Sequence, residues 1–189
     1  MIRVKADQLA KAQRLLSHMP KTVPIAVANA TNRAAEAART ELVRKVRETY
    51  HAKYGTMHSA IRIKRASPGA KIIKATLKVY DTRRPLIQFK VSPNAPQPGG
   101  RRPAVLMVAV RKDTGMKPYP GAFVAKGKKT GLPWVLKRVG RDRYPLHIKY
   151  GPSTSELAGS QHVRESVEQR AQEMLDKRLE HEINRLIGG

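Results

Sequence analysis

The chain has 189 residues, which is long enough for one well-buried core and short for two. It contains 38 Lys and Arg residues against 14 Asp and Glu residues, a formal net charge of +24, and no cysteine. This composition excludes a disulfide framework, a thiolate metal site and a cysteine nucleophile, and the charge indicates a polyanionic or acidic partner.

The excess of positive charge lies in the middle of the chain. Residues 51–152 contain 23 basic and 3 acidic side chains, whereas residues 1–50 contain 10 and 4, and residues 153–189 contain 5 and 7. We expect a single domain over residues 1–189 that has these three parts: a helical N-terminal part, a basic β-rich part and a C-terminal helix. The charge therefore belongs to one structural region and not to a tail.

No segment has the length or pattern of a membrane span or a leader. The longest apolar run of the middle part, Ala104 to Val110, has seven residues, far below the roughly 20 that cross a bilayer. The N-terminus lacks an uninterrupted apolar core and a small-residue cleavage site, so we expect no signal peptide. Together with the absence of cysteine, this predicts a protein that folds in a cytoplasm.

An alanine-rich segment, 22–50, is the first long element. Its apolar residues recur every three or four positions, which predicts one face of a long helix with Thr22 as its N-cap. Pro24 falls in the first turn, where proline is tolerated. A shorter helix over about 5–18 is expected before it. The apolar face consists of Val23, Val27, Ala30, Ala34, Ala38, Leu42, Val46 and Tyr50.

The C-terminal end is predicted to be helical as well. Ser153 and Glu156 fit a capping box, in which each side chain bonds the backbone N–H of the other residue. A break is expected at Gly159, and a long helix follows that ends at the two terminal glycines. Its apolar stripe consists of Val163, Val167, Ala171, Met174, Leu175, Leu179, Ile183 and Leu186.

Several runs between these helical ends have the pattern of β-strands. In some of them apolar and cationic residues alternate, so one face can pack on a core while the other carries cations into solvent. The sequence therefore predicts an α+β fold, with a central, mostly antiparallel, strongly basic β-sheet or partial barrel flanked by long N-terminal and C-terminal α-helices. The runs are Ile61–Ala66, Lys71–Tyr80, Leu86–Val91, Ala104–Lys112, Gly121–Ala125, Leu132–Val139 and Leu146–Tyr150.

Proline and glycine mark the connections between the strands. Ser67–Gly69 and Tyr119–Gly121 are turn signals. Ser92–Pro103 contains four prolines and two glycines and is predicted to be a long exposed loop. Phe123 follows two small residues, and we expect it in the core and not on a contact surface.

The histidines do not form a metal-ligand pattern. His51 and His58 lie seven residues apart, but across an expected helix break at Gly55. The triplet 180–182 (Glu-His-Glu) begins like a zinc-protease motif and lacks the second histidine four positions on. We therefore expect no metal site.

A catalytic constellation is not visible either. The basic middle part offers only Asp81, Asp113 and Asp142 as carboxylates, each beside a cation or a turn, and we interpret them as local charge compensation. There is no phosphate-binding glycine motif and no acid–base pair. The sequence thus predicts no enzyme, no cofactor and no small-molecule substrate.

Clusters of basic residues are the stronger candidates for a functional surface. Each cluster alone could be a solvated turn, but the surplus of charge in the middle part favours contact with phosphates or with an acidic protein surface. Because no helix-turn-helix, zinc finger or aromatic RNA-binding motif is present, such contact with nucleic acid should not depend on base sequence. The candidates are Arg101, Arg102, Lys126, Lys128, Lys129, Arg138, Arg141 and Arg143.

A family resemblance rests on several motifs in a fixed order. IRIKRASPGAKIIKATLKV is followed by RRPLIQF, YPGAFVAKG and YPLHIKYGPS, and the alanine-rich segment NATNRAAEAARTELVRKV precedes them. Together these motifs resemble the minor tail protein Z family of tailed bacteriophages and prophages. The resemblance covers about residues 20–155, while the loop 92–103 and the stretch 126–132 depart from the family pattern.

The resemblance implies a structural protein of the virion that completes the tail at its head-proximal end and makes it competent to join the head. It implies other tail and neck or connector proteins as partners, and the apolar helix stripes suit a homo-oligomeric ring. A basic region that faces phage DNA, without sequence preference, fits this position. The family has no known catalytic residues to carry over.

Two other classes of function stay open at this point. The charge alone is compatible with a free, non-sequence-specific nucleic-acid-binding protein of the ribosome-associated type. A nuclease would need metal-dependent cleavage that is abolished by replacing Asp81, Asp113 or Asp142. We expect no such activity.

Overall fold

The structure is a computed structural model that describes residues 22–80, 83–97, 105–127 and 130–187. The chain divides into two compact units. Unit 1 contains residues 1–45, 58–80 and 158–189, and unit 2 contains residues 46–57 and 81–157. The elements are α2 (Val23–Thr49), α3 (Tyr54–Ser59), β1 (Ile61–Lys64), β2 (Thr76–Val79), η1 (Leu86–Gln88, a 3₁₀ turn), β3 (Lys90–Ser92), β4 (Leu106–Ala109), β5 (Lys117–Tyr119), β6 (Ala122–Lys126), β7 (Pro133–Arg138), β8 (Leu146–Ile148), α4 (Thr154–Gly159) and α5 (Gln161–Ile187).

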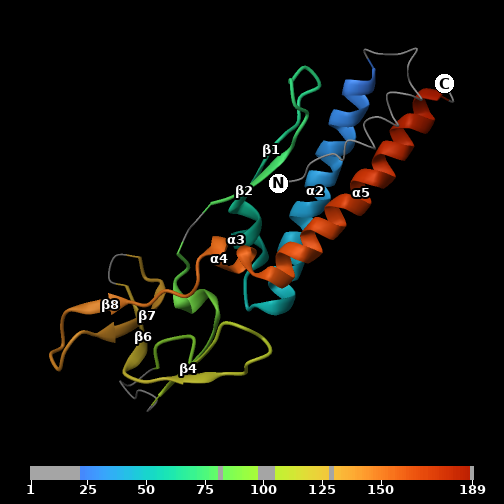
Figure 1. Ribbon diagram of the computed structural model, residues 1–189. Helices are drawn as coiled ribbons and strands as arrows, with labels where there is room; N and C mark the ends of the chain where they lie inside the picture. The colour runs from blue at the N-terminus through green and yellow to red at the C-terminus, as the bar shows by residue number, and fades with distance from the viewer. Residues whose placement is uncertain (1–21, 81–82, 98–104, 128–129, 188–189) are drawn as a thin grey trace. The chain divides into compact units, whose positions relative to one another are not determined.

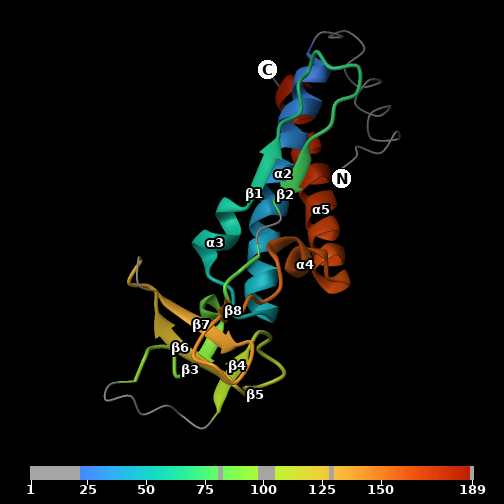
Figure 2. The same ribbon diagram turned by 90° about the vertical axis from the view of Figure 1, so that its left-hand side faces the viewer.

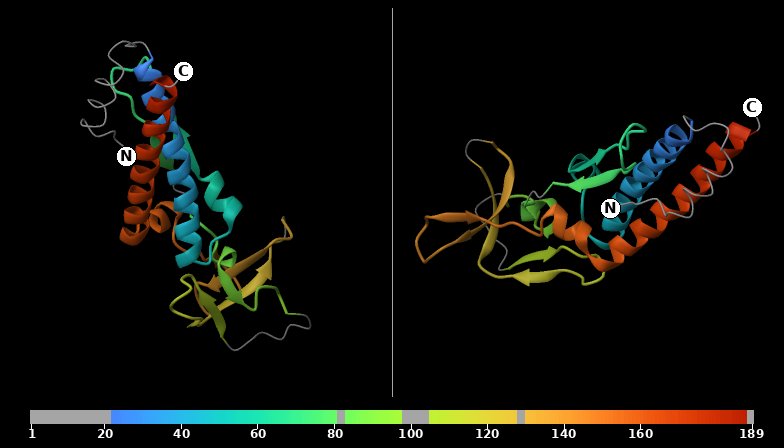
Figure 3. Two further views of the ribbon diagram at one scale, coloured as in Figure 1. Left: turned by 90° about the vertical axis from the view of Figure 1, so that its right-hand side faces the viewer. Right: turned by 45° about the horizontal axis from the view of Figure 1, so that its top comes forward.

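Two long antiparallel helices, α2 and α5, form the centre of unit 1 (Figure 1). The start of α2 packs on the end of α5, and views from other sides show the two helices staying side by side (Figure 3). The predicted helix 22–50 is confirmed within one residue at each end. Burial of its apolar stripe supplies most of its stability, since helix propensity alone is a weak contribution. The shared core consists of Val23, Val27, Ala30, Ala34, Leu175, Leu179 and Ile183.

The hairpin of β1 and β2 lies along another face of α2 (Figure 2). Its contact uses small side chains, since Ala28 and Ala35 of α2 pack with Ala66 and Ala75 of the hairpin. Alanines allow a helix and a strand to approach closely. The alanine-rich composition of α2 therefore serves two packing faces, one toward α5 and one toward the hairpin.

Asn32 connects α2 to the end of strand β1. Its Oδ1 accepts a hydrogen bond from the backbone N–H of Ala66 at 2.7 Å, and its Nδ2 donates to the carbonyl oxygen of Ala66 at 3.1 Å. Ala66 is buried, so both backbone groups need a partner inside the protein. The amide side chain of Asn32 supplies both partners at once, as a neighbouring strand would.

A buried carboxylate connects α2 to α5. Glu41 accepts hydrogen bonds from Arg44 Nε at 2.9 Å, from Arg44 Nη2 at 2.7 Å and from Ser166 Oγ of α5 at 2.7 Å. The hydrogen bond from Arg44 is the largest cause that holds the pKa of Glu41 below its usual 4.5, against the opposing effect of burial. The ionised form of Glu41 is therefore the one that the folded state prefers.

This preference makes unit 1 sensitive to acid. Because the folded-state pKa of Glu41 is depressed, its contribution to the free energy of unfolding is present above pH 4.5 and is lost as the pH falls below that value. We expect Glu41→Gln to lower the stability by about 1 kcal/mol at neutral pH, with a difference that shrinks as the pH falls below 4.5. Urea unfolding followed by far-UV circular dichroism measures it. Glu180→Gln, at an exposed position of α5, is the control, and an equal pH dependence of the two variants would contradict the assignment.

Unit 2 contains two three-stranded antiparallel sheets, with strand orders β3–β4–β5 and β6–β7–β8. Gly121 has a φ of +74° in the turn between β5 and β6, which confirms the predicted turn and explains its glycine. The 3₁₀ turn η1 contacts both β3 and β7. Short segments thus hold the two sheets together within this unit.

The predicted capping box begins α4. The Oε2 of Glu156 accepts the backbone N–H of Ser153 at 2.7 Å, and the Oγ of Ser153 accepts the backbone N–H of Glu156 at 3.3 Å. The expected break at Gly159 is confirmed, because α4 ends there and α5 begins at Gln161. The last helix of the structure runs to Ile187.

The α+β prediction with antiparallel pairing is confirmed, but the sheet arrangement is wrong in part. In the described residues the strands form three open sheets of two, three and three strands, and not one central sheet or a partial barrel. The β1–β2 hairpin belongs to unit 1 with the helices, whereas the other strands belong to unit 2. That residues 1–189 form a single domain stays a prediction, and the expected helix over 5–18 lies outside the described residues.

Two local predictions need correction, and one strand was not predicted. The segment 86–91 is a 3₁₀ turn followed by β3, because the N–H groups of Gln88 and Phe89 bond back to Pro85 and Leu86. β5 was not predicted, since Pro118 at its centre weakens the strand signal. The expected helix break between His51 and His58 is present, but it lies between the end of α2 at Thr49 and the start of α3 at Tyr54, and Gly55 itself is in the first turn of α3. No helix within the described ranges is long and apolar enough to cross a membrane.

Candidate functional site

Four of the predicted cationic residues lie in the described part of unit 2. Lys126 ends β6 and is exposed, Arg138 ends β7 and is half-buried, and Arg141 and Arg143 are exposed in the turn between β7 and β8. The other four lie outside the described residues: Arg101, Arg102, Lys128 and Lys129.

The sheet separates Lys126 from the arginines. Lys126 pairs with Pro133 at the start of β7, and Arg138 lies five residues further along that strand. At a rise of about 3.3 Å per residue, this is a separation of roughly 17 Å. Arg138, Arg141 and Arg143 form one cluster at one end of the sheet, and Lys126 belongs to the other end.

The β6–β7–β8 sheet has two faces of different character. Residues directly opposite each other in an antiparallel pair point to the same side. The register places Phe123 opposite Leu136, and Leu136 opposite Ile148. We call this side the Trp134 face; it consists of Phe123, Ala125, Trp134, Leu136, Arg138, Leu146 and Ile148.

The opposite side of this sheet faces the rest of unit 2. It carries Val135, whose side chain is 1% exposed, and Lys137, whose Nζ lies 5.8 Å from the ring centre of Tyr119 in β5. β7 also contacts η1. The one buried side chain of this sheet, Val135, is therefore on this side, whereas the residues of the Trp134 face are half-buried or exposed.

Aromatic rings orient two of the predicted arginines. The guanidinium of Arg138 lies 5.9 Å from the ring centre of Phe123, and that of Arg143 lies 5.8 Å from the ring centre of Tyr144. A cation over a ring gains about 0.5–1 kcal/mol at an exposed site. The expectation that Phe123 lies in the core is wrong, because its side chain is half-buried on the Trp134 face.

A second concave surface of unit 2 is a groove of about 570 Å³ beside β4 and β5. Tyr50, Tyr119 and Tyr150 line it, together with Arg111 and Lys117. Backbone bridges Tyr50–Arg111 and Pro85–Tyr150 bring these distant segments together. Sequence reasoning missed this groove because no local pattern relates the three tyrosines.

Arg111 at this groove is already neutralised by a neighbour. Its Nε and Nη2 donate to Asp113 at 2.9 Å and 2.7 Å. These hydrogen bonds hold the pKa of the Asp113 carboxyl below its usual range. The interpretation of Asp113 as local charge compensation fits this pair, so Asp113 is not placed as a catalytic carboxylate.

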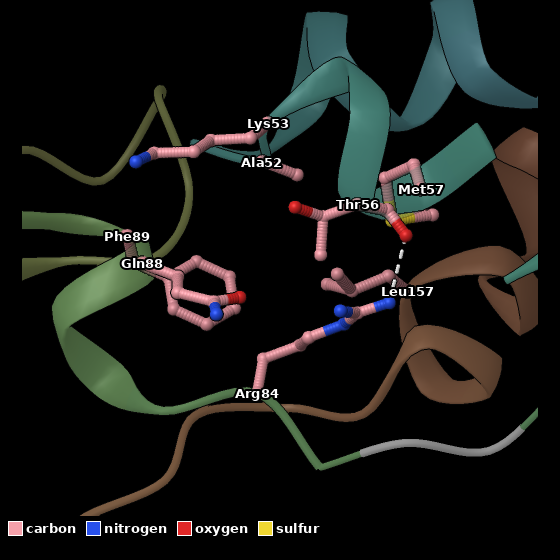
Figure 4. A pocket seen from close by; sticks show the side chains of 8 residues that line it. All are labelled: Ala52, Lys53, Thr56, Met57, Arg84, Gln88, Phe89 and Leu157. Carbon is pink, nitrogen blue, oxygen red and sulfur yellow. Dashed lines mark hydrogen bonds between the residues drawn. The ribbon is translucent and has the colours of Figure 1, made fainter. Parts of the chain in front are cut away.

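A half-buried arginine, Arg84, occupies the interior of unit 2 (Figure 4). Its Nη2 donates to the carbonyl oxygen of Thr56 in α3 at 2.8 Å, and its Nε donates to Oγ1 of Thr154 in α4 at 3.0 Å. Burial lowers its pKa from the ordinary value. The adjoining cavity, beside Phe89 and Leu157, holds only about 10 Å³, which is less than a ligand needs. Arg84 therefore connects elements and does not form a binding site.

The segments RRPLIQF and YGPS of the family motifs meet in the same unit. The backbone N–H of Gly151 donates to the carbonyl oxygen of Arg84 at 2.8 Å, and that of Leu86 donates to Lys149 at 2.9 Å. A Cβ on Gly151 would lie 2.5 Å from the ring of Phe89, so only glycine leaves room for this ring. The motif residues thus hold the fold, and the candidate surface lies elsewhere.

The described features are those of a binding surface. Among the described residues, no group of three or more His, Cys, Asp or Glu side chains could hold a metal ion. The features at hand are an arginine cluster, a half-exposed apolar sheet face and a tyrosine-lined groove. Such features recognise macromolecules through charge and apolar contact.

One family model matches nearly the whole chain. It is described as prophage minor tail protein Z (GPZ), and it matches residues 7–187. The comparisons with curated proteins and with solved structures gave no match. The family resemblance inferred from the sequence motifs is therefore confirmed.

Proposed function

The chain belongs to the prophage minor tail protein Z family, and we propose that it completes the phage tail at its head-proximal end and makes the tail competent to join the head. The observation that carries this proposal is the family match over residues 7–187. Because the family is one of structural tail proteins, this chain has a structural role in the tail of the virion.

The proposed partners are other tail proteins and the neck or connector proteins of the head. We propose a homo-oligomeric ring as the working form, since a tail end has cyclic symmetry and closed rings use one repeated interface. In this position the protein needs no catalytic group, no cofactor and no small-molecule substrate. Assembly would take place in the host cytoplasm.

The basic surface of unit 2 supports a place next to a polyanion or an acidic subunit. Arg138, Arg141 and Arg143 are gathered at one end of a sheet that carries a single carboxylate, Asp142, between Ala122 and Ile148. Unbalanced charge of this kind is stabilised by a neighbour of opposite sign. We propose that this surface faces phage DNA or acidic neighbouring subunits within the particle.

The location of the protein in the particle distinguishes the tail function from that of a free nucleic-acid-binding protein. Both proteins would lose affinity for DNA steeply with salt, so DNA binding alone does not decide. Mass spectrometry of purified virions distinguishes the two functions. We expect it to find this protein at a small and constant copy number per particle. Absence of the protein from purified tails would exclude the tail function.

A charge-reversal variant tests the contribution of the predicted basic set Lys126, Lys128 and Lys129. We expect the triple change of Lys126, Lys128 and Lys129 to Glu to lower head–tail joining at least tenfold, because it replaces three cations by anions beside the proposed partner. The fold should be retained, since charge changes at the surface usually alter stability little. Complementation of a phage that lacks the gene, with counts of infectious particles and of unjoined tails, measures the effect.

The control for this variant changes three exposed lysines of unit 1. Lys71, Lys74 and Lys78 lie in and beside β2, and their replacement by Glu shifts the net charge by the same amount. Normal joining is expected. Equal losses in both triple variants would attribute the defect to net charge and not to Lys126, Lys128 and Lys129, and normal joining in both would exclude these three lysines as a contact.

A further inference from the structure

The Trp134 face is an apolar surface that the described elements cover only in part, since its residues are half-buried and Ile148 is exposed. Of the residues in β6, β7 and β8, only Val135 is buried, and it points to the opposite side. Ile148 on the Trp134 face is 37% exposed. A contiguous face of Phe, Trp, Leu and Ile side chains in contact with water is costly, and such patches mark sites of interaction.

The arginines make one end of this face positively charged. Arg138 lies on it, and its Nε is inaccessible to water and has no hydrogen-bond partner among the described residues. Arg141 and Arg143 follow in the adjacent turn. This Nε is out of reach of a partner, so the property that a partner can recognise is the positive charge that Arg138 shares with Arg141 and Arg143. A carboxylate accepts from a guanidinium more strongly than neutral groups do.

We propose that the Trp134 face is the docking surface for an acidic protein segment of the tail or neck, which presents apolar side chains to Trp134, Phe123 and Leu136 and a carboxylate to Arg138. This inference rests on the proposed tail function, and it names the class of partner that the function left open. Tryptophan and arginine are the residues that most often dominate the binding energy of protein interfaces.

Duplex DNA matches this face less well. Its backbone offers phosphates to the arginines, but its bases are stacked inside the helix and cannot cover Trp134, Leu136 and Ile148. The protein would then keep its apolar face in water while its cations were neutralised. A protein partner can cover the apolar side chains and neutralise the arginines in one contact.

A second copy of this chain is also less suitable. Two copies of the Trp134 face would bring Arg138, Arg141 and Arg143 of one copy against the same cations of the other, and like charges across an interface cost binding energy. The acidic side chains of unit 1 lie mainly on α5, whose apolar stripe is used against α2. The described surface of the chain thus lacks a patch that is both acidic and apolar.

The test uses purified tails that lack this protein and the full-length chain. We expect Ile148→Ser to reduce binding to these tails about tenfold, as loss of an interface anchor does, and to leave the affinity for a short DNA duplex unchanged. Arg138→Gln should reduce tail binding to a similar extent. The control is Val139→Ser, a change at a residue that is 61% exposed and lies outside the face. Co-sedimentation measures tail binding, and the emission of Trp134, the single tryptophan, reports folding.

The outcomes separate the two proposals. If the wild-type chain does not bind tails, the proposed tail function fails, and this assignment fails with it. If the wild-type chain binds and Ile148→Ser binds equally well, only the docking surface is wrong. Loss of DNA affinity with unchanged tail binding would make the face a DNA contact and overturn the inference.

A cross-linking experiment tests the chemistry of the partner. A photoreactive residue introduced as Ile148→p-benzoylphenylalanine should cross-link to a tail or neck protein within a segment that has net negative charge. The same residue at Val139 should give little of this product. Cross-links to DNA, to a segment of net positive charge or to a second copy of this chain would overturn the inference.

Discussion

Replacing Asn32 by alanine is expected to destabilise unit 1 by about 2 kcal/mol, since two hydrogen bonds to buried backbone groups are lost. The side chain of Asn32 accepts from the N–H of Ala66 and donates to its carbonyl oxygen. Both groups of Ala66 would be left without these partners at a position that is 8% exposed. Urea unfolding followed by far-UV circular dichroism measures the loss, because α2 and α5 give most of the signal.

Hydrogen exchange gives a local measurement of the same contact. The amide of Ala66 should exchange faster in Asn32→Ala than in the wild-type chain, since its acceptor is the Asn32 oxygen. Arg33→Ala is the control, because Arg33 is the next residue of α2 and its side chain is 67% exposed. Its effect should stay within about 0.5 kcal/mol. Equal stabilities of the two variants would show that Asn32 does not hold the strand.

Replacing Arg84 by methionine should destabilise unit 2 by about 2 kcal/mol, since a charged donor loses two hydrogen-bond partners. These partners are the carbonyl oxygen of Thr56 and the hydroxyl of Thr154. The methionine fills a similar volume and removes the cost of burying a charge, which limits the loss. Trp134 lies in unit 2 and is the single tryptophan, so its emission during urea unfolding measures this unit.

The neighbouring Arg83 provides a matched control for Arg84. It is exposed in the structure, and Arg83→Met removes the same charge without disturbing the bonds to Thr56 and Thr154. We expect its unfolding midpoint to equal that of the wild-type chain within error. An equal loss in both variants would mean that overall charge, and not the position of the Arg84 guanidinium, sets the stability.

The helices could be predicted from the sequence because their signals are local. The stripe from Val23 to Val46 repeats every three or four residues, and the capping box of Ser153 and Glu156 spans three residues. In both cases the residues that make the contact lie within one or two helical turns. The partner of α2 could not be predicted, because nothing in the stripe of Val27 specifies α5 over another apolar helix.

The strands were predicted less well because their pairing depends on distant residues. The segment Lys71–Tyr80 has the alternation of a long strand, yet only Thr76–Val79 pairs with β1. Ala75, just before this strand, packs against α2, and residues 71–74 do not form strand at all. Alternation predicts which side chains share a face but not how many residues find a partner.

For the candidate surface, the sequence predicted which residues are basic but not how they are arranged. Sequence reasoning identified Lys126 and Arg138 as members of one basic set, but the register places them at opposite ends of a sheet and on opposite faces. The apolar character of the Trp134 face follows from the pairing of β6 with β7 and of β7 with β8. Phe123 was expected in the core because it is an aromatic residue that follows two small residues. This local pattern does not indicate which face of a sheet is covered.

Unit 1 is assembled from segments at both ends of the chain, and this has a consequence for its biosynthesis. The start of helix α2 is translated before the whole of unit 2, and Leu175 and Leu179, which cover Val27, are translated after this unit. While unit 2 is being translated, the nascent chain therefore displays an apolar helix without its partner, which is the kind of surface that chaperones bind. A nonsense codon shortly before α5 would thus produce a long polypeptide in which α2 lacks its partner helix and unit 1 cannot form its core.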